Sequence, residues 1–370
     1  MCNVAGYAGN RQAAPILLEM LRRQQDFDGG MSTGIATIHE GKLHYRKVIG
    51  NVDKLIAETD ALSLPGTVGI AHTRPGGTPG MMQFAHPSVN MEETLALITN
   101  GATQKNCGYE QKWNEAVQLL EKKGYQFKTE SKKVFGTAPV LSNNAHVHPP
   151  EARAFLVDMY MKEGMSITEA LARTCEDIYA DNISVVVHQD LPGKFFACRT
   201  NRPLSVLMTG QETYAATTRF AFPEDLQGKY FMVPTMNVCS FSAEGVTVTQ
   251  DRVNVEEVSD MTPRACIEGY RFIEDLLRGK KDDPMSFDDI EAAAFDHRDH
   301  MFEGNHTFAQ HSRLVYDILW QMKQEGRLQV QSRLLDRSHH PVMEMERQLR
   351  GDPTSDGVDT VLRAFMWLED

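Results

Sequence analysis

Apolar residues in the first 50 positions follow two different spacings. Residues 3–9 form a short apolar run, typical of a buried strand. The next apolar side chains recur three and four positions apart, as on one face of a helix, and a glycine-rich turn then separates them from two alternating runs. The pattern predicts a strand at 3–9, a helix at 15–24, a turn at 26–30 and strands at 34–38 and 42–48.

The middle of the chain predicts further strands and two amphipathic helices. A strand at 67–71 leads His72-Thr73-Arg74 into a loop, and a strand at 95–98 ends at Thr99-Asn100-Gly101. Ser166 and Glu169 have the spacing of a capping box at the start of a helix. The remaining elements are helices at 110–123 and 166–179 and strands at 183–188, 194–198, 204–208, 213–216, 236–241 and 246–250. Few helices among many antiparallel strands favour an α+β layered domain.

Beyond residue 260 the pattern becomes helical. Helices are predicted at 263–278, 286–297, 307–325, 341–349 and 360–368, with a charged linker at 280–284. We therefore divide the chain into a domain at 1–255 and a helical extension at 256–370. An alternative is that helix 307–325 and residues 326–330 are the last helix and wing of a winged-helix fold.

Composition narrows the classes of function. The 370 residues carry a formal net charge of −12, which disfavours nucleic-acid binding. No apolar run approaches the roughly 20 residues that cross a membrane, and no secretory signal is recognised, so we expect a cytoplasmic protein. The six cysteines are scattered without a Cys-x-x-Cys pair, so neither disulfides nor a zinc ribbon is indicated. The histidines and carboxylates at 296–306 lack a known ligand spacing, and no metal or other cofactor is predicted.

Cys2 carries the strongest chemical signal. If Met1 is removed, Cys2 has both a thiol and a free α-amino group. An α-amine titrates near pH 8, so a useful fraction is neutral at physiological pH and accepts the proton of the thiol. One residue then supplies both nucleophile and base. The alternative is an incidental small residue at position 2.

Four separated motifs carry a resemblance to a known family. Cys2 to Gly9, His72-Thr73-Arg74, Ala85-His86-Pro87 and Asn100-Gly101 occur in the order found in the class II glutamine amidotransferase domain. The resemblance covers about residues 2–250. It implies the fold of the N-terminal-nucleophile hydrolases, a four-layer αββα sandwich of antiparallel sheets, here followed by the C-terminal helical extension.

The resemblance also implies roles for individual residues. Cys2 attacks the side-chain amide of glutamine, while the Asn100 side chain and the Gly101 N–H stabilise the oxyanion. Arg74 binds the glutamine α-carboxylate through its planar fork of donors. The remaining substrate-binding candidates, which line the same pocket, are Thr73, His86, Gly29, Asp28 and Lys132.

Two charged residues depart from the family pattern. Lys132 stands where the family has an aspartate that holds the glutamine α-ammonium group, and Asp28-Gly29 replaces the usual Arg-Gly. Pro75 and Gly77 also differ from the family. Because the two charge changes have opposite sign, we hypothesise that Asp28 pairs with Lys132 or takes over the ammonium contact. Alternatively, both residues lie on solvated loops.

The sequence thus predicts an amide hydrolase that releases ammonia from glutamine through a γ-glutamyl thioester. No glycine-rich phosphate loop is visible after residue 260, so an ammonia-accepting partner protein is expected. Neither nucleic acid nor membrane is an expected partner, and an oligomer is compatible with the sequence. The alternatives are a catalytically weak binding or regulatory protein and a hydrolase of a different amide.

Overall fold

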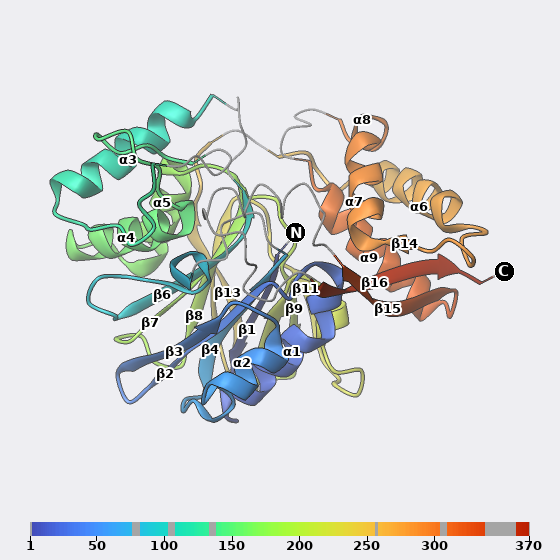
Figure 1. Ribbon diagram of the computed structural model, residues 1–370, viewed down its shortest axis with the longest axis horizontal. Helices are drawn as coiled ribbons and strands as arrows, with labels where there is room; N and C mark the ends of the chain where they lie inside the picture. The colour runs from blue at the N-terminus through green and yellow to red at the C-terminus, as the bar shows by residue number, and fades with distance from the viewer. Residues whose placement is uncertain are drawn as a thin grey trace.

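The structure is a computed structural model that describes residues 2–75, 82–102, 108–132, 138–255, 258–303, 309–336 and 360–369. Two antiparallel sheets in these residues form the larger part of the molecule (Figure 1). The first sheet has the strand order β11-β9-β10-β1-β4-β2-β3. Its strands are β1 (Asn3–Ala8), β2 (Ser32–His39), β3 (Lys42–Val48), β4 (Val68–Arg74), β9 (Ser205–Met208), β10 (Thr213–Ala216) and β11 (Lys229–Met232).

The second sheet has the order β13-β12-β8-β7-β6-β5. Its strands are β5 (Ser88–Val89), β6 (Leu95–Ala102), β7 (Asp181–His188), β8 (Phe195–Arg199), β12 (Asn237–Ser242) and β13 (Gly245–Arg252). The two sheets pack face to face, since Val4 of β1, Ile98 of β6 and Ile183 of β7 lie in one buried cluster. The prediction of an α+β protein with antiparallel sheets is confirmed.

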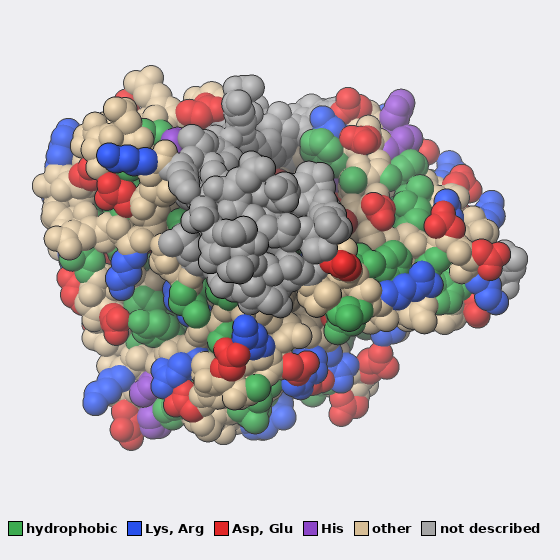
Figure 2. All heavy atoms as spheres, viewed as in Figure 1, with side chains coloured by type: hydrophobic (Ala, Val, Ile, Leu, Met, Phe, Trp, Pro, Cys, Tyr) green, Lys and Arg blue, Asp and Glu red, His purple; other side chains and the backbone are tan. Residues whose placement is uncertain are grey.

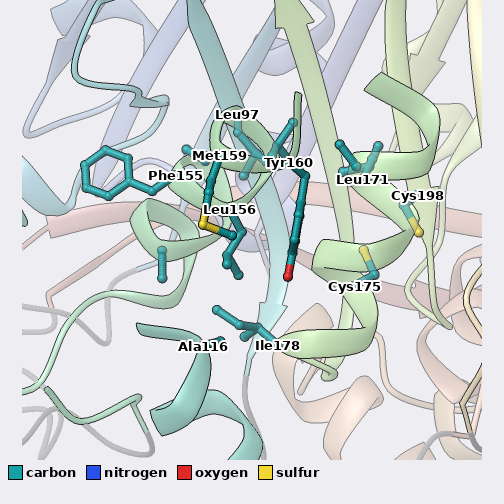
Figure 3. Packing of buried hydrophobic residues seen from close by; sticks show 14 of the residues in the cluster. Leu97, Ala116, Phe155, Leu156, Met159, Tyr160, Leu171, Cys175, Ile178 and Cys198 are labelled. Atoms are coloured by element: carbon teal, nitrogen blue, oxygen red, sulfur yellow. The ribbon is translucent and has the colours of Figure 1, made fainter. Parts of the chain in front are cut away.

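Helices cover the outer face of each sheet. Side chains of β1 alternate between the two faces, so Ala5 and Tyr7 point away from the second sheet and pack against Leu17. This outer layer consists of α1 (Ala13–Asp28), α2 (Val52–Glu58) and the short helix η1 (Ala61–Ser63). The other outer layer consists of α3 (Glu110–Lys122), α4 (Pro149–Lys162) and α5 (Ile167–Asp177). Figure 3 shows Phe155 and Leu171 of the latter two helices in the buried cluster that includes Leu97 of β6.

The C-terminal unit combines helices with a small sheet of order β14-β16-β15. Its elements are α6 (Pro263–Leu277), β14 (Met285–Ser286), α7 (Phe287–Asp296), α8 (Arg298–Met301), α9 (His311–Gln324), β15 (Leu328–Asp336) and β16 (Thr360–Leu368). The prediction of a helix at 360–368 is wrong, and the extension is not purely helical. Residues 360–368 pair antiparallel with β15 along their whole length. Val361 and Arg363 are buried on one face of this strand, and Ala364 and Met366 are buried on the other. The helix predicted at 341–349 lies outside the described residues.

The winged-helix alternative assigned residues 307–325 to a last helix and residues 326–330 to a wing, and the structure has α9 and the start of β15 in these two places. However, α9 is buried along most of its length, and its Trp320 ring lies 5.1 Å from that of Phe220 in the short helix η3 (Arg219–Ala221). The ring of Phe27, at the end of α1, contacts the rings of Phe220, Phe287 and Tyr316 in tilted or edge-to-face geometry, with ring centroids 4.8 to 5.9 Å apart. One buried apolar cluster therefore joins the C-terminal unit to α1 and η3.

Three other local predictions needed correction. Helix α1 continues to Asp28, although a turn was expected from residue 26. His72, Thr73 and Arg74 are the last residues of β4, where a loop was expected. Helix α4 was not predicted; Pro149 and Pro150 occupy its first turn, where a missing N–H has no consequence. None of the helices described here is long and apolar enough to cross a membrane.

Candidate active site

Cys2 lies beside the strand end that carries Thr73 and Arg74. It directly precedes β1, in which Asn3 is the antiparallel partner of Thr73 on β4. The marked N-terminus lies near the centre of Figure 1, between the α3–α5 helices and the C-terminal unit. Cys2 is partly exposed, and its thiol forms no disulfide with the other cysteines that the structure describes. The nucleophile predicted from the sequence is therefore accessible.

A histidine ties this end of the first sheet to the second sheet. His72, the cross-strand partner of Val4, is fully buried, and its Nε2–H donates to the backbone oxygen of Thr99 at 2.8 Å. Burial, reinforced by the charge of Arg74, lowers the pKa of His72 to about 3, so the imidazole is neutral. Because Thr99 precedes Asn100, this hydrogen bond brings the end of β6 to the end of β4.

Asn100 and Gly101 have two unusual features. Asn100 is fully buried, yet neither its Nδ2 nor its Oδ1 finds a hydrogen-bond partner among the described residues. Buried amides are nearly always satisfied, so an amide left open suggests that its partner is a ligand. Gly101 has φ +124°, and an added Cβ would lie 1.9 Å from the backbone oxygen of Asp181. Only glycine fits there, next to the open amide.

Thr73 and Gly29 are also brought together. The Gly30 N–H donates to Thr73 Oγ1 at 2.8 Å, and Thr33 Oγ1 lies 3.0 Å from the same oxygen. A Cβ on Gly29 would lie 2.7 Å from Thr73 Cγ2. The turn after α1 thus packs tightly against the strand that carries Arg74, whose own Nη1 donates to the Phe84 oxygen at 3.1 Å.

His86 belongs to a cluster of three imidazoles, in which His72 and His86 are buried and His148 is partly buried. Its ring centroid lies 4.0 Å from that of His72 and 5.8 Å from that of His148. Burial lowers the pKa values of His86 and His148 well below the usual range, so both rings are neutral. His148 was missed at the sequence level, because its only signal is its position directly before α4, a helix that was not predicted.

The two charged departures occupy different environments. Asp28 is 1% exposed, and its Oδ1 lies 3.7 Å from Nη2 of Arg363 on β16. Lys132 is exposed. The structure thus gives Asp28 a cationic partner that the sequence did not predict. Gly77 and Cys107 lie outside the described residues, as does Met1.

The histidine-rich segment after α7 contains stacked rings. The His297 ring lies 4.1 Å from that of Phe272 and 4.6 Å from that of His300. Within the described part of the chain, no group of three or more histidine, cysteine or acidic side chains is arranged to hold a metal ion. His306 of this segment is outside the described residues.

No protein-family model matches the chain. Among curated proteins, it is 26% identical over 224 residues to the glutamine–fructose-6-phosphate aminotransferase of Pyrococcus horikoshii, covering 60% of this chain and 33% of that protein. The corresponding protein of Methanothermobacter thermautotrophicus is 30% identical over 220 residues, which is 59% of this chain and 33% of the relative. The chain thus matches about a third of the length of these relatives.

A solved structure has a similar fold to this chain. The glutamine phosphoribosylpyrophosphate amidotransferase from B. subtilis, complexed with ADP and GMP, superposes with a TM-score of 0.54 at 18% identity. The superposition covers 73% of this chain and 52% of that one. At this identity the likeness concerns the fold.

Proposed function

This chain carries a class II glutamine amidotransferase domain, distantly homologous to the glutaminase domains of the aminotransferases and the amidotransferase named above, and we propose that it releases ammonia from glutamine. The main support for this proposal is the buried Asn100 amide beside Gly101, which has no hydrogen-bond partner within the described part of the chain. Oxyanion sites need donors that are fixed in place before the reaction and are not used by the protein itself.

The chemistry begins at Cys2. With Met1 removed, the α-amine of Cys2 accepts the thiol proton, and the thiolate attacks the side-chain carbonyl carbon of glutamine. The oxyanion accepts hydrogen bonds from Asn100 Nδ2–H and the Gly101 N–H. The amine returns the proton to the leaving nitrogen as the C–N bond breaks, giving ammonia and a γ-glutamyl thioester. Water, deprotonated by the same amine, then cleaves the C–S bond and yields glutamate.

The other residues of the site bind the substrate. Arg74 receives the α-carboxylate, and Thr73 and Gly29 shape the pocket beside it. Three neutral imidazoles next to Arg74 add no positive charge to the pocket. The guanidinium of Arg74 therefore supplies the charge that selects a carboxylate.

A different amide is the second candidate substrate, and Lys132 is the reason. A cation at the position of the family's aspartate would repel an α-ammonium group by on the order of 1 to 4 kcal/mol at short range. An amide that lacks this ammonium group would avoid the repulsion. Ammonia release from a panel of amides with and without an α-amino group distinguishes the two substrates.

We propose that another protein accepts the ammonia. The C-terminal unit is small, and its apolar face is occupied by contacts to Phe27 and Phe220. A catalytically weak binding or regulatory protein is the alternative. It predicts ligand binding without ammonia release.

The test is covalent labelling with diazo-oxonorleucine, a glutamine analogue that alkylates the nucleophile. Intact mass should show loss of Met1 and one adduct per chain in the wild type. Cys2→Ala should form no adduct, whereas Cys266→Ala, which alters another exposed cysteine, should still form one. A wild-type protein that lacks Met1 and yet forms no adduct would argue for the regulatory alternative or for a different amide.

A further inference from the structure

The last turn of α1 carries acidic side chains, although negative charge is unfavourable at the C-terminal end of a helix. Asp26 and Asp28 lie at the C-terminal end of α1, whose carbonyl groups already give this end a partial negative charge. Asp28 is 1% exposed, so water does little to stabilise its carboxylate. Such an end requires cations or donors from elsewhere in the fold.

The C-terminal sheet supplies them. Arg363 of β16 is also 1% exposed; its Nη1 donates to the Gly29 oxygen at 2.9 Å, and its Nη2 lies 3.7 Å from Asp28 Oδ1. On the other side, Asp288 Oδ2 lies 3.7 Å from its Nε. Ser332 of β15 donates its hydroxyl to Asp26 Oδ2 at 2.5 Å. Two neighbouring strands of the C-terminal sheet thus contact the end of α1.

The turn that Arg363 contacts is part of the candidate active site. The Gly30 N–H donates to Thr73 Oγ1, and the Met31 N–H donates to the Arg74 oxygen at 2.9 Å. When the side-chain amide of Asn3 is oriented so that both its oxygen and its nitrogen form hydrogen bonds, its nitrogen donates to the backbone oxygen of Asp28 at 3.2 Å. The same few residues therefore contact Arg363 on one side and the neighbours of Cys2 and Arg74 on the other.

We propose that Arg363 is a positioning residue for the glutamine site: by holding the Gly29-Gly30 turn, it fixes Thr73 and the strand that presents Arg74, so the C-terminal unit is a component of the site. The role in glutamine binding rests on the proposed function, whereas the role of Arg363 in holding the turn does not. Arg363 and Gly29 are 334 residues apart in the sequence. Displacing the C-terminal unit would then weaken glutamine binding without touching the nucleophile.

The variants are Arg363→Met, Arg363→Lys and the matched control Arg333→Met. Arg333 is the cross-strand partner of Arg363 on β15 and is exposed. Three quantities are measured in the full-length chain: amide exchange at Gly30 and Met31, KM and kcat for glutamine, and the rate of Cys2 alkylation by iodoacetamide. Iodoacetamide reports the thiol without needing the glutamine pocket.

We expect Arg363→Met to speed exchange at these two amides and to raise KM by about tenfold or more, as loss of a hydrogen bond from a charged group implies. Alkylation should stay within about twofold of wild type, and Arg333→Met should change none of the three quantities. Arg363→Lys keeps the charge but not the planar fork, so smaller changes of the same kind are expected. Arg363→Lys also allows the proposal to be tested if Arg363→Met does not fold.

Wild-type exchange and KM in a folded Arg363 variant would overturn the proposal. Equal acceleration of exchange throughout the chain would also overturn it, because Arg363 would then only stabilise the fold. If the wild type releases no ammonia from glutamine, the proposed function fails, and exchange at Gly30 and Met31 alone decides whether Arg363 holds the turn.

Discussion

Asn100 and Asn90 are both fully buried asparagines with opposite environments. The Asn90 side chain accepts from the Thr94 and Leu95 N–H groups and donates to Asp158, whereas the Asn100 amide has no partner among the residues that the structure describes. The residue identity and burial are the same in the two cases. The difference is that the Asn90 amide forms hydrogen bonds that hold the fold together, whereas the Asn100 amide remains available to a ligand.

This difference predicts opposite effects for one substitution. Asn100→Ala should lower kcat by about 10² to 10³. It should change the free energy of unfolding by less than about 1 kcal/mol, because the described residues form no hydrogen bond with this amide that could be lost. Asn90→Ala should leave kcat near wild type and lower the free energy of unfolding by about 3 kcal/mol, since it leaves several buried polar groups without a hydrogen-bond partner. Urea unfolding and steady-state kinetics measure both; a destabilised Asn100→Ala would mean that the amide has a structural partner.

Gly101 allows a second comparison at the level of single residues. Gly101→Ala combines a positive φ with a clash against the Asp181 oxygen and should cost about 2 kcal/mol or more, with loss of ammonia release. Gly164 has φ +101°, but no atom of the described residues lies within 4 Å of an added Cβ, so Gly164→Ala should cost about 1 kcal/mol and leave activity intact. Equal costs in urea unfolding would contradict this interpretation of Gly101.

At the level of elements, the sequence predicted what local periodicity determines. Strand β3 and the Ser166 capping box of α5 match their predictions. β16 was taken for a helix because its apolar residues fit both periods, and only pairing with β15 decides between them. Arg363 could not be assigned to the site from sequence, since its partner Asp28 lies at the other end of the chain.

The contact between β4 and β6 predicts a pH dependence. The folded-state pKa of His72 is about 3, below the ordinary value of 6.5 for the unfolded chain, so unfolding takes up a proton between these values. The contribution of His72 to stability is complete above pH 6.5 and falls by about 1.4 kcal/mol per unit as the pH drops toward 3. His72→Gln should reduce this slope in urea unfolding between pH 6 and pH 4. An unchanged slope would show that His72 is not buried as a neutral imidazole.

Across the whole molecule, the C-terminal unit is packed on the amidotransferase domain. The helix that a winged-helix protein would present to DNA, α9, here contacts Phe220 through Trp320. Figure 2 shows acidic, basic and hydrophobic side chains interspersed over this unit. Its contacts to α1 and η3 fit the role in site assembly proposed above.

Because the shared apolar cluster spans both parts, they should unfold together. Phe27→Ala removes a ring that contacts Phe220, Phe287 and Tyr316, and should cost about 3 to 5 kcal/mol in a single cooperative transition. Phe295→Ala, at an exposed ring of α7, should cost less than about 1 kcal/mol. Two separate transitions in the wild type would contradict a shared core.

The most direct measurement is the rate of ammonia release from glutamine by the full-length protein lacking Met1. We expect release by the wild type and by Cys266→Ala. We expect none above background for Cys2→Ala and a rate lower by about 10² to 10³ for Asn100→Ala. A Cys2→Ala protein that releases ammonia at the wild-type rate would show that this thiol is not the nucleophile.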